Sequence, residues 1–158
     1  MSLQPKVHLG KFSAEGFRFA IVASRWTDSL VAKLIDGALE ALEEHGATSD
    51  AIEVFRVPGA FEIPLAAKKV AESGNWDAVI NLGVVIRGGT PHFEYVAGAA
   101  AEGSTQVSLQ TGVPVLFGVI TADNIQQAVD RSGKRNENKG FEAAMAAIEV
   151  VNLYKEIT

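Results

Sequence analysis

The chain has 158 residues, a typical length for one globular domain, and its 47% hydrophobic content is enough to form a core, which excludes a disordered chain. The net charge of -5 argues against a nucleic acid partner, and the absence of cysteine excludes disulfides, thiolate metal sites and cysteine nucleophiles. No apolar run reaches the roughly 18 residues of a membrane span and no signal-peptide pattern is present, so we expect a cytoplasmic protein without a membrane partner.

Two units of strand and helix are predicted in the first half of the chain. Residues 17–23 form the first strand, and apolar residues then recur at helical spacing up to Gly46. Residues 52–57 form the second strand, which ends at Pro58-Gly59 and is followed by a helix that stops near Gly74. This alternation is typical of parallel strands joined by crossover helices.

The second half of the chain continues the alternation. Residues 77–86 are apolar without a polar face, as expected of a central strand that helices cover on both sides. A helix is predicted over about residues 93–110, a fourth strand over residues 114–121, a helix that begins near Asp123 and Asn124, and a last helix over about residues 141–154.

We therefore predict an α/β fold with three α/β/α layers and a doubly wound, mainly parallel four-stranded sheet of flavodoxin-like topology. Residues 1–158 are expected to form a single domain, in which residues 1–12 are an N-terminal arm or an edge strand that pairs with this sheet or with a neighbouring subunit.

Ligands bind such sheets in the crevice between the loops that follow the carboxyl ends of the strands. In the third of these loops, Gly88-Gly89-Thr90 presents backbone N–H groups at a predicted helix N-terminus, which favours an anion such as phosphate. The alternative is a tight turn in which the glycines only supply unusual backbone angles and Thr90 caps the helix. Neither GxxxxGK[ST] nor GxGxxG occurs, so the main support for ATP or NAD is lacking.

His92 follows this turn at the start of the predicted helix. An imidazole can give or take a proton near neutral pH, and a helix N-terminus favours its neutral form, so His92 is a candidate for proton transfer. The alternative is a solvated surface histidine. His8 and His45 are interpreted as surface residues because neither lies in a loop that follows a strand.

Other loops carry residues that are unusual in plain connections. Trp26 could stack on a flat heterocycle or be a half-buried packing residue. Glu62 could accept hydrogen bonds from a polyol or simply oppose the dipole of the helix that it precedes. The basic stretch at residues 131–139 is either a solvated face or the second wall of an anion site.

Five segments, in this order and spacing, resemble the lumazine synthase family: residues 24–26 (SRW), 57–64 (VPGAFEIP), 83–95 (GVVIRGGTPHFEY), 117–121 (FGVIT) and 138–140 (NKG). The resemblance runs over nearly the whole chain, and its second and third segments are highly specific. It implies a transferase that needs no cofactor or metal. This enzyme condenses 5-amino-6-(D-ribitylamino)uracil with 3,4-dihydroxy-2-butanone 4-phosphate to 6,7-dimethyl-8-ribityllumazine, releasing phosphate and water, in riboflavin biosynthesis.

The resemblance also implies which residues bind the pyrimidine substrate. Trp26 would stack on the pyrimidine, residues 59–62 would hold its ribityl chain, and strand residues 84–86 would bond the pyrimidine edge. The implied substrate-binding residues of this half of the site are Trp26, Thr27, Gly59, Ala60, Phe61, Glu62, Val84, Val85 and Ile86.

For the phosphate substrate, the resemblance implies that Gly89 and Thr90 form the phosphate-holding turn. His92 and Arg131 would be the catalytic residues, His92 for proton transfer and Arg131 as the phosphate-binding arginine. Phe117 also matches a substrate-binding position of the family, as does Lys139.

The resemblance further implies a homopentamer whose active site is shared between subunits. Phe117 and Arg131 would come from the neighbouring subunit, whereas the subunit that supplies Lys139 is left open. The loop at residues 133–140 lacks the insertion associated with isolated pentamers, so we expect twelve pentamers to form an icosahedral capsid of sixty chains. An association with riboflavin synthase is also expected.

The chain departs from the family pattern at three positions. The family commonly has Phe where this chain has Trp26, and the wider ring leads to the hypothesis that the pocket also holds riboflavin. The family often has Asn at Thr27, and the shorter reach of threonine puts one ligand hydrogen bond in doubt. It commonly has Gly at Glu137, where a glutamate would resist backbone angles that a glycine adopts.

Three alternatives stay open. A flavin-storage module would keep Trp26 but lack turnover, which the intact His92 and Arg131 argue against. A purely structural shell protein would need neither of these two side chains for its role. A flavodoxin-like signalling domain shares the fold but needs an acidic or FMN-phosphate loop after the first strand, which residues 24–27 do not resemble.

Overall fold

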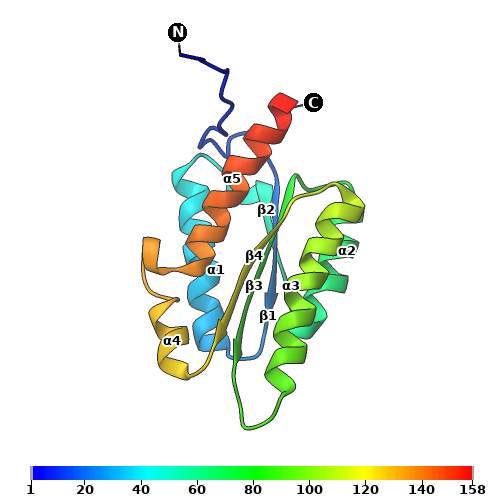
Figure 1. The fold of residues 1–158 in the computed structure, drawn as a ribbon, viewed down its shortest axis with the longest axis vertical. Coiled ribbons are helices and arrows are strands. Elements are labelled where there is room, and N and C mark those ends of the chain that lie inside the picture. The colour runs from blue at the N-terminus through cyan, green and yellow to red at the C-terminus, as the bar shows by residue number, and fades with distance from the viewer. Residues whose placement is uncertain (1, 158) are drawn as a thin grey trace.

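The computed structural model describes residues 2–157, so Met1 and Thr158, the ends of the predicted domain and arm, lie outside the described residues. A single parallel sheet lies at the centre of the fold (Figure 1), with the strand order β2-β1-β3-β4. The strands are β1 (Phe19–Ser24), β2 (Ile52–Val57), β3 (Ala78–Ile86) and β4 (Val115–Ala122). The predicted α/β class and the four parallel strands are confirmed.

The helices cover both faces of this sheet, as the prediction of three layers requires. Figure 1 shows α1, α4 and α5 on one side of the sheet and α2 and α3 on the other. The helices are α1 (Asp28–Glu44), α2 (Ile63–Glu72), α3 (His92–Thr111), α4 (Ile125–Asp130) and α5 (Lys139–Ile157), with short 3-10 turns η1 (Ser49–Ala51), η2 (Ala60–Glu62) and η3 (Arg135–Glu137). Asn124 caps α4 as predicted, because its Oδ1 accepts a hydrogen bond from the Gln127 N–H at 2.9 Å.

Burial on two faces explains why the strands lack polar alternation. Side chains of β1 and β3 point alternately to two apolar clusters, so that Ile21 and Ile80 pack toward α1 and α5, whereas Val22 and Val79 pack toward α2 and α3. All four of these residues have no exposed surface. The seven residues at the start of β3 are buried, which confirms its predicted central position.

The N-terminal arm forms no strand within residues 2–12. Its apolar side chains Leu3, Val7 and Leu9 are at least 71% exposed, while His8 Nδ1 lies 3.0 Å from Glu156 Oε2 on α5. Pairing of this arm with a neighbouring subunit therefore stays a prediction. Among the helices of residues 2–157, none is long and apolar enough to cross a membrane.

Helix α5 lies against α1 at a very short distance, and Gly140 makes this possible. A Cβ built on Gly140 would lie 1.9 Å from the backbone oxygen of Leu34. Gly140 lies in the first turn of α5, so α1 and α5 cannot keep this separation if the position carries a side chain.

We expect the substitution Gly140→Ala to lower the free energy of unfolding by about 3 kcal/mol, since the clash is with backbone and forces the two helices apart. Chemical denaturation would measure this loss. Gly98→Ala in α3 is the matched control, because a Cβ there meets no atom within 4 Å and alanine favours a helix. Equal effects of the two substitutions would contradict the proposed role of the close packing.

Candidate active site

The pocket that gathers most of the predicted site residues, which we call the principal pocket, lies at the carboxyl edge of the sheet, where β1 pairs with β2 on one side and β3 on the other. Connections from such neighbouring strands leave in opposite directions and open a crevice between them. The cavity has a volume of about 470 Å³. Its lining residues are Ser24, Trp26, Thr27, Gly59, Ala60, Phe61, Glu62, Val84, Val85, Ile86, Gly88, Thr90, His92, Phe93 and Val96.

This pocket gathers the predicted pyrimidine-binding residues and two residues of the phosphate half, Thr90 and His92. It does not include Gly89, although both neighbours of that residue line it. Phe117, Arg131 and Lys139 are also outside it. Gly88, which the sequence placed in the predicted anion-binding turn, also lines the pocket, whereas sequence reasoning assigned no site role to three further lining residues, namely Ser24, Phe93 and Val96.

Backbone hydrogen bonds hold the first loop of the pocket against the second. The N–H groups of Arg25 and Trp26 donate to the carbonyl oxygens of Val57 and Pro58 at 2.6 and 2.9 Å. The indole of Trp26 lies over Gly59, where a Cβ would come within 2.5 Å of its Cε3 atom. Trp26 is 60% exposed, so its ring is held from one side and open on the other.

Thr27 adopts a backbone conformation that its side chain disfavours. It precedes α1 with φ 61° and ψ 43°, in the left-handed region, and it makes no side-chain cap hydrogen bond. A β-branched residue in this region is strained, whereas asparagine tolerates it. The backbone at this position would therefore suit asparagine, the residue that the resemblance led us to expect there, better than threonine.

The carboxylate of Glu62 has a local partner in the pocket wall. Its Oε2 accepts a hydrogen bond from the backbone N–H of Gly59 at 3.2 Å. This bond stabilises the η2 turn and gives Glu62 a local structural role. The same side chain still lines the pocket and has further acceptor capacity for a ligand.

The turn at residues 87–91 does not have the structure of the alternative considered for it. Neither Gly88 nor Gly89 has a positive φ, and a Cβ on either would meet no atom within 4 Å. Helix α3 begins at His92 with Pro91 as its N-cap and without a side-chain cap hydrogen bond, so Thr90 does not cap it. Neither a positive φ nor a close contact within the chain therefore requires glycine at these two positions.

Arg87, which the sequence reasoning did not single out, anchors this turn. Its Nε donates to Asp123 Oδ1 at 2.9 Å, its Nη1 pairs with Glu94, and its guanidinium lies 4.4 Å from the ring centre of Phe93. The hydrogen bond from Arg87 lowers the pKa of the Glu94 carboxyl below its ordinary value and keeps it charged. The signal in the sequence was an arginine directly after the central strand with an acidic residue in the next helical turn.

His92 is exposed at the first position of α3 and faces this pocket. The other two histidines lie elsewhere, as expected: His8 contacts Glu156, and His45 Nδ1 is 2.7 Å from the carbonyl oxygen of Ala41. His92 is therefore the one histidine of the chain in a position to exchange protons with a ligand in the pocket.

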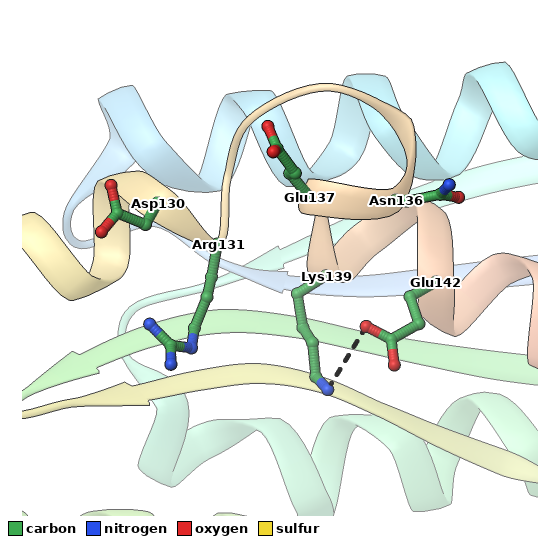
Figure 2. Close-up of a pocket in the computed structure, with 6 residues that line it drawn as sticks. All are labelled: Asp130, Arg131, Asn136, Glu137, Lys139 and Glu142. Atoms are coloured by element: carbon green, nitrogen blue, oxygen red, sulfur yellow. Dashed lines mark ion pairs between the residues drawn. The ribbon is translucent and has the colours of Figure 1, made fainter.

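The predicted cationic residues lie in a second, smaller cavity of about 130 Å³ beside the start of α5 (Figure 2). Arg131 Nη1 donates to the Gln127 carbonyl oxygen at 3.0 Å, and Lys139 Nζ lies 3.6 Å from Glu142 Oε2. Figure 2 shows the side chains of Arg131 and Lys139 extending in the same direction. Phe117, on β4, is 36% exposed. Arg131 and Lys139 share this second cavity, Phe117 lines neither of the two cavities, and we refer to these three residues outside the principal pocket as the second group.

The expectation that Glu137 strains its turn is wrong. The left-handed residue of this loop is Arg135, with φ 48°, while Glu137 ends the η3 turn with no positive φ. Arg135 is held there by Glu44 and Glu40, at 2.7 and 3.2 Å from its Nη1. The strain therefore falls two residues earlier, on a side chain that has partners on α1.

Comparison with known proteins gives consistent results. A family model described as 6,7-dimethyl-8-ribityllumazine synthase matches residues 16–155. A protein of that name from Chlorobium phaeobacteroides is 53% identical over 154 residues, which cover 98% of this chain and 99% of that protein. A Clostridium kluyveri protein of the same name is 52% identical over 152 residues, covering 96% and 99%.

Replacing Thr27 by asparagine should relieve the backbone strain at the pocket edge. We expect Thr27→Asn to raise the free energy of unfolding by about 1 kcal/mol, because asparagine adopts the left-handed conformation at lower cost. Thermal unfolding would detect this as a higher Tm. Thr27→Val, which keeps the branched Cβ, serves as the control, and a gain of stability with valine would contradict the explanation.

Proposed function

The chain belongs to the 6,7-dimethyl-8-ribityllumazine synthase family, and we propose that the pocket between β1 and β3 is where it carries out the family's condensation. The protein is a transferase-type enzyme of riboflavin biosynthesis. It condenses 5-amino-6-(D-ribitylamino)uracil with 3,4-dihydroxy-2-butanone 4-phosphate. The main support for placing the reaction in this pocket is that it gathers an open aromatic face, polar groups and a histidine. The histidine lies next to a turn that gives α3 no side-chain cap.

The pyrimidine substrate is proposed to bind between Trp26 and the end of β3. The indole offers an exposed face for stacking, and it is kept in place by the loop contacts with Pro58 and Gly59. The ribityl chain then lies along η2, where Glu62 has acceptor capacity left for hydroxyl groups. The idea that riboflavin itself binds on Trp26 stays a prediction, which quenching of flavin fluorescence would test.

The phosphate substrate is proposed to bind at the turn before α3. Gly88 and Gly89 leave the backbone N–H groups accessible, and Thr90 has a hydroxyl that the helix does not use. The substrate amine attacks the ketone to form an imine with loss of water, phosphate then leaves, and ring closure releases a second water. His92, beside this turn, is proposed to transfer the protons of these steps.

The active site is proposed to be completed by a neighbouring subunit. Arg131, Lys139 and Phe117 are outside the principal pocket of their own chain, and they are exposed, or partly exposed in the case of Lys139, for contact with another. A pentamer would bring this second group to the phosphate of each neighbour, and the exposed arm at residues 2–12 would add contacts.

At the level of the whole protein, we propose a single cytoplasmic domain that forms pentamers. Twelve pentamers would assemble into an icosahedral capsid able to associate with riboflavin synthase. The loop at residues 133–140 supports the closed capsid because it is short and is packed on α1 through Arg135 and Asn138.

The enzymatic proposal is tested by incubating the protein with both substrates and following lumazine formation by absorbance. We expect product with the wild type and a loss of about 10- to 100-fold in kcat/KM with Arg131→Ala, since a charged hydrogen bond to phosphate is removed. Lys134→Ala removes a charge from the same loop outside this cavity and should retain activity. No product from the wild type would contradict the assignment.

The shared site is tested by mixing two variants that each have reduced activity alone. We expect His92→Ala and Arg131→Ala subunits, refolded together, to recover about a quarter of wild-type activity, because random association forms that fraction of intact interfaces. Analytical ultracentrifugation should show pentamers or their sixty-chain assembly. A monomer, or mixed oligomers with no recovered activity, would rule out a site built between subunits.

A further inference from the structure

Ser24, the last residue of β1, places a buried hydroxyl without a hydrogen-bond partner in the wall of the principal pocket. Its residue is 1% exposed. Among the side chains that the structure describes, only its Oγ and Asn81 Oδ1 are buried polar atoms that lack a partner. Such atoms are rare in native proteins because each has lost its hydrogen bonds to water without replacement, so each requires an explanation.

The two unpartnered atoms have different surroundings. Asn81 is fully buried in β3, and its Nδ2 donates to Ser104 Oγ at 2.9 Å, while that hydroxyl donates to the Ala100 carbonyl oxygen at 2.6 Å. The asparagine is therefore fixed within the protein by its amide nitrogen and does not line the pocket. Ser24 does line it, so the serine hydroxyl is the one of the two unpartnered groups that borders the space for a ligand.

The neighbouring strand leaves room for this hydroxyl. A Cβ built on Gly83 would lie 2.9 Å from Ser24 Oγ and 3.2 Å from Ile63 Cδ1. A side chain at position 83 would therefore press on the serine. Ile63 directly follows η2, so Ser24 lies below the segment proposed to hold the ribityl chain, two residues before Trp26.

We propose that the Ser24 hydroxyl is a further substrate-binding group, which hydrogen-bonds the ribityl-bearing pyrimidine from the floor of the pocket. This inference rests on the proposed function and adds a residue to it. A hydroxyl both donates and accepts, which suits a polyol. A hydroxyl group of the substrate in this pocket would give Ser24 Oγ a hydrogen-bond partner that no side chain of the described residues provides. The phosphate substrate, at residues 88–90, does not use it.

The test compares wild type, Ser24→Ala and Ser104→Ala for product formation, for the KM of each substrate and for Tm. For Ser24→Ala we expect the KM of the ribitylaminopyrimidine to rise by about 5- to 20-fold. This is the effect expected when one hydrogen bond to the substrate is lost and the substrate group is left without a partner. The KM of the phosphate substrate should stay within about twofold of the wild-type value, because a change of that size is too small for a lost hydrogen bond. The Tm should not fall, because an unpaired buried hydroxyl is removed.

Ser104→Ala is the matched control, since it removes a buried and partnered serine outside the pocket. It should lower the Tm, by leaving the Asn81 amide unpaired, and leave both KM values unchanged. An unchanged pyrimidine KM in Ser24→Ala, an equal rise for both substrates, or a fall in Tm like that of Ser104→Ala would each overturn the inference. Failure of the wild type to form any product would instead overturn the proposed function itself.

Discussion

Parallel pairing of β1 with both β2 and β3 is the interaction on which the rest of the structure depends. Parallel neighbours cannot be joined by a hairpin, so each connection runs through a helix that packs on one face of the sheet. With the order β2-β1-β3-β4, the chain adds β2 on one side of β1 and then β3 on the other. The loops after β1 and β3 then separate and leave a cavity at their carboxyl ends. The position of the pocket is therefore a consequence of the topology, before any catalytic side chain is considered.

Within that cavity, backbone contacts do much of the positioning. The first loop is tied to the second through the N–H groups of Arg25 and Trp26, and Gly59 lets the indole lie against the chain. On the other side, Arg87 connects the end of β3 with Asp123 and Glu94. Each exposed ion pair contributes little to stability alone, but together they restrict the turn that carries Thr90 and His92. Such preorganisation is useful to a reaction that depends on placing two substrates.

The distribution of charge also supports the proposal that the active site is completed by a neighbouring subunit. The principal pocket contains Glu62 and His92 but no lysine or arginine among its lining residues, whereas Arg131 and Lys139 lie at a separate surface. A phosphate substrate needs more positive potential than one turn provides. A cation from a neighbouring chain would supply it, and activity would then depend on assembly.

The sequence by itself determined the elements and the family. Continuous apolar segments marked the strands, helical spacing marked the helices, and VPGAFEIP with GVVIRGGTPH identified the family, since these patterns depend on residues near one another in the chain. Only the tertiary structure decided the role of residues whose partners are distant. It showed that Thr90 does not cap α3, that strain falls on Arg135 instead of Glu137, and that Ser24 is buried against Gly83 with its hydroxyl unpaired. A lone serine at the end of an apolar strand carries no local signal, because whether its hydroxyl finds a partner is set by the strands and helices packed around it.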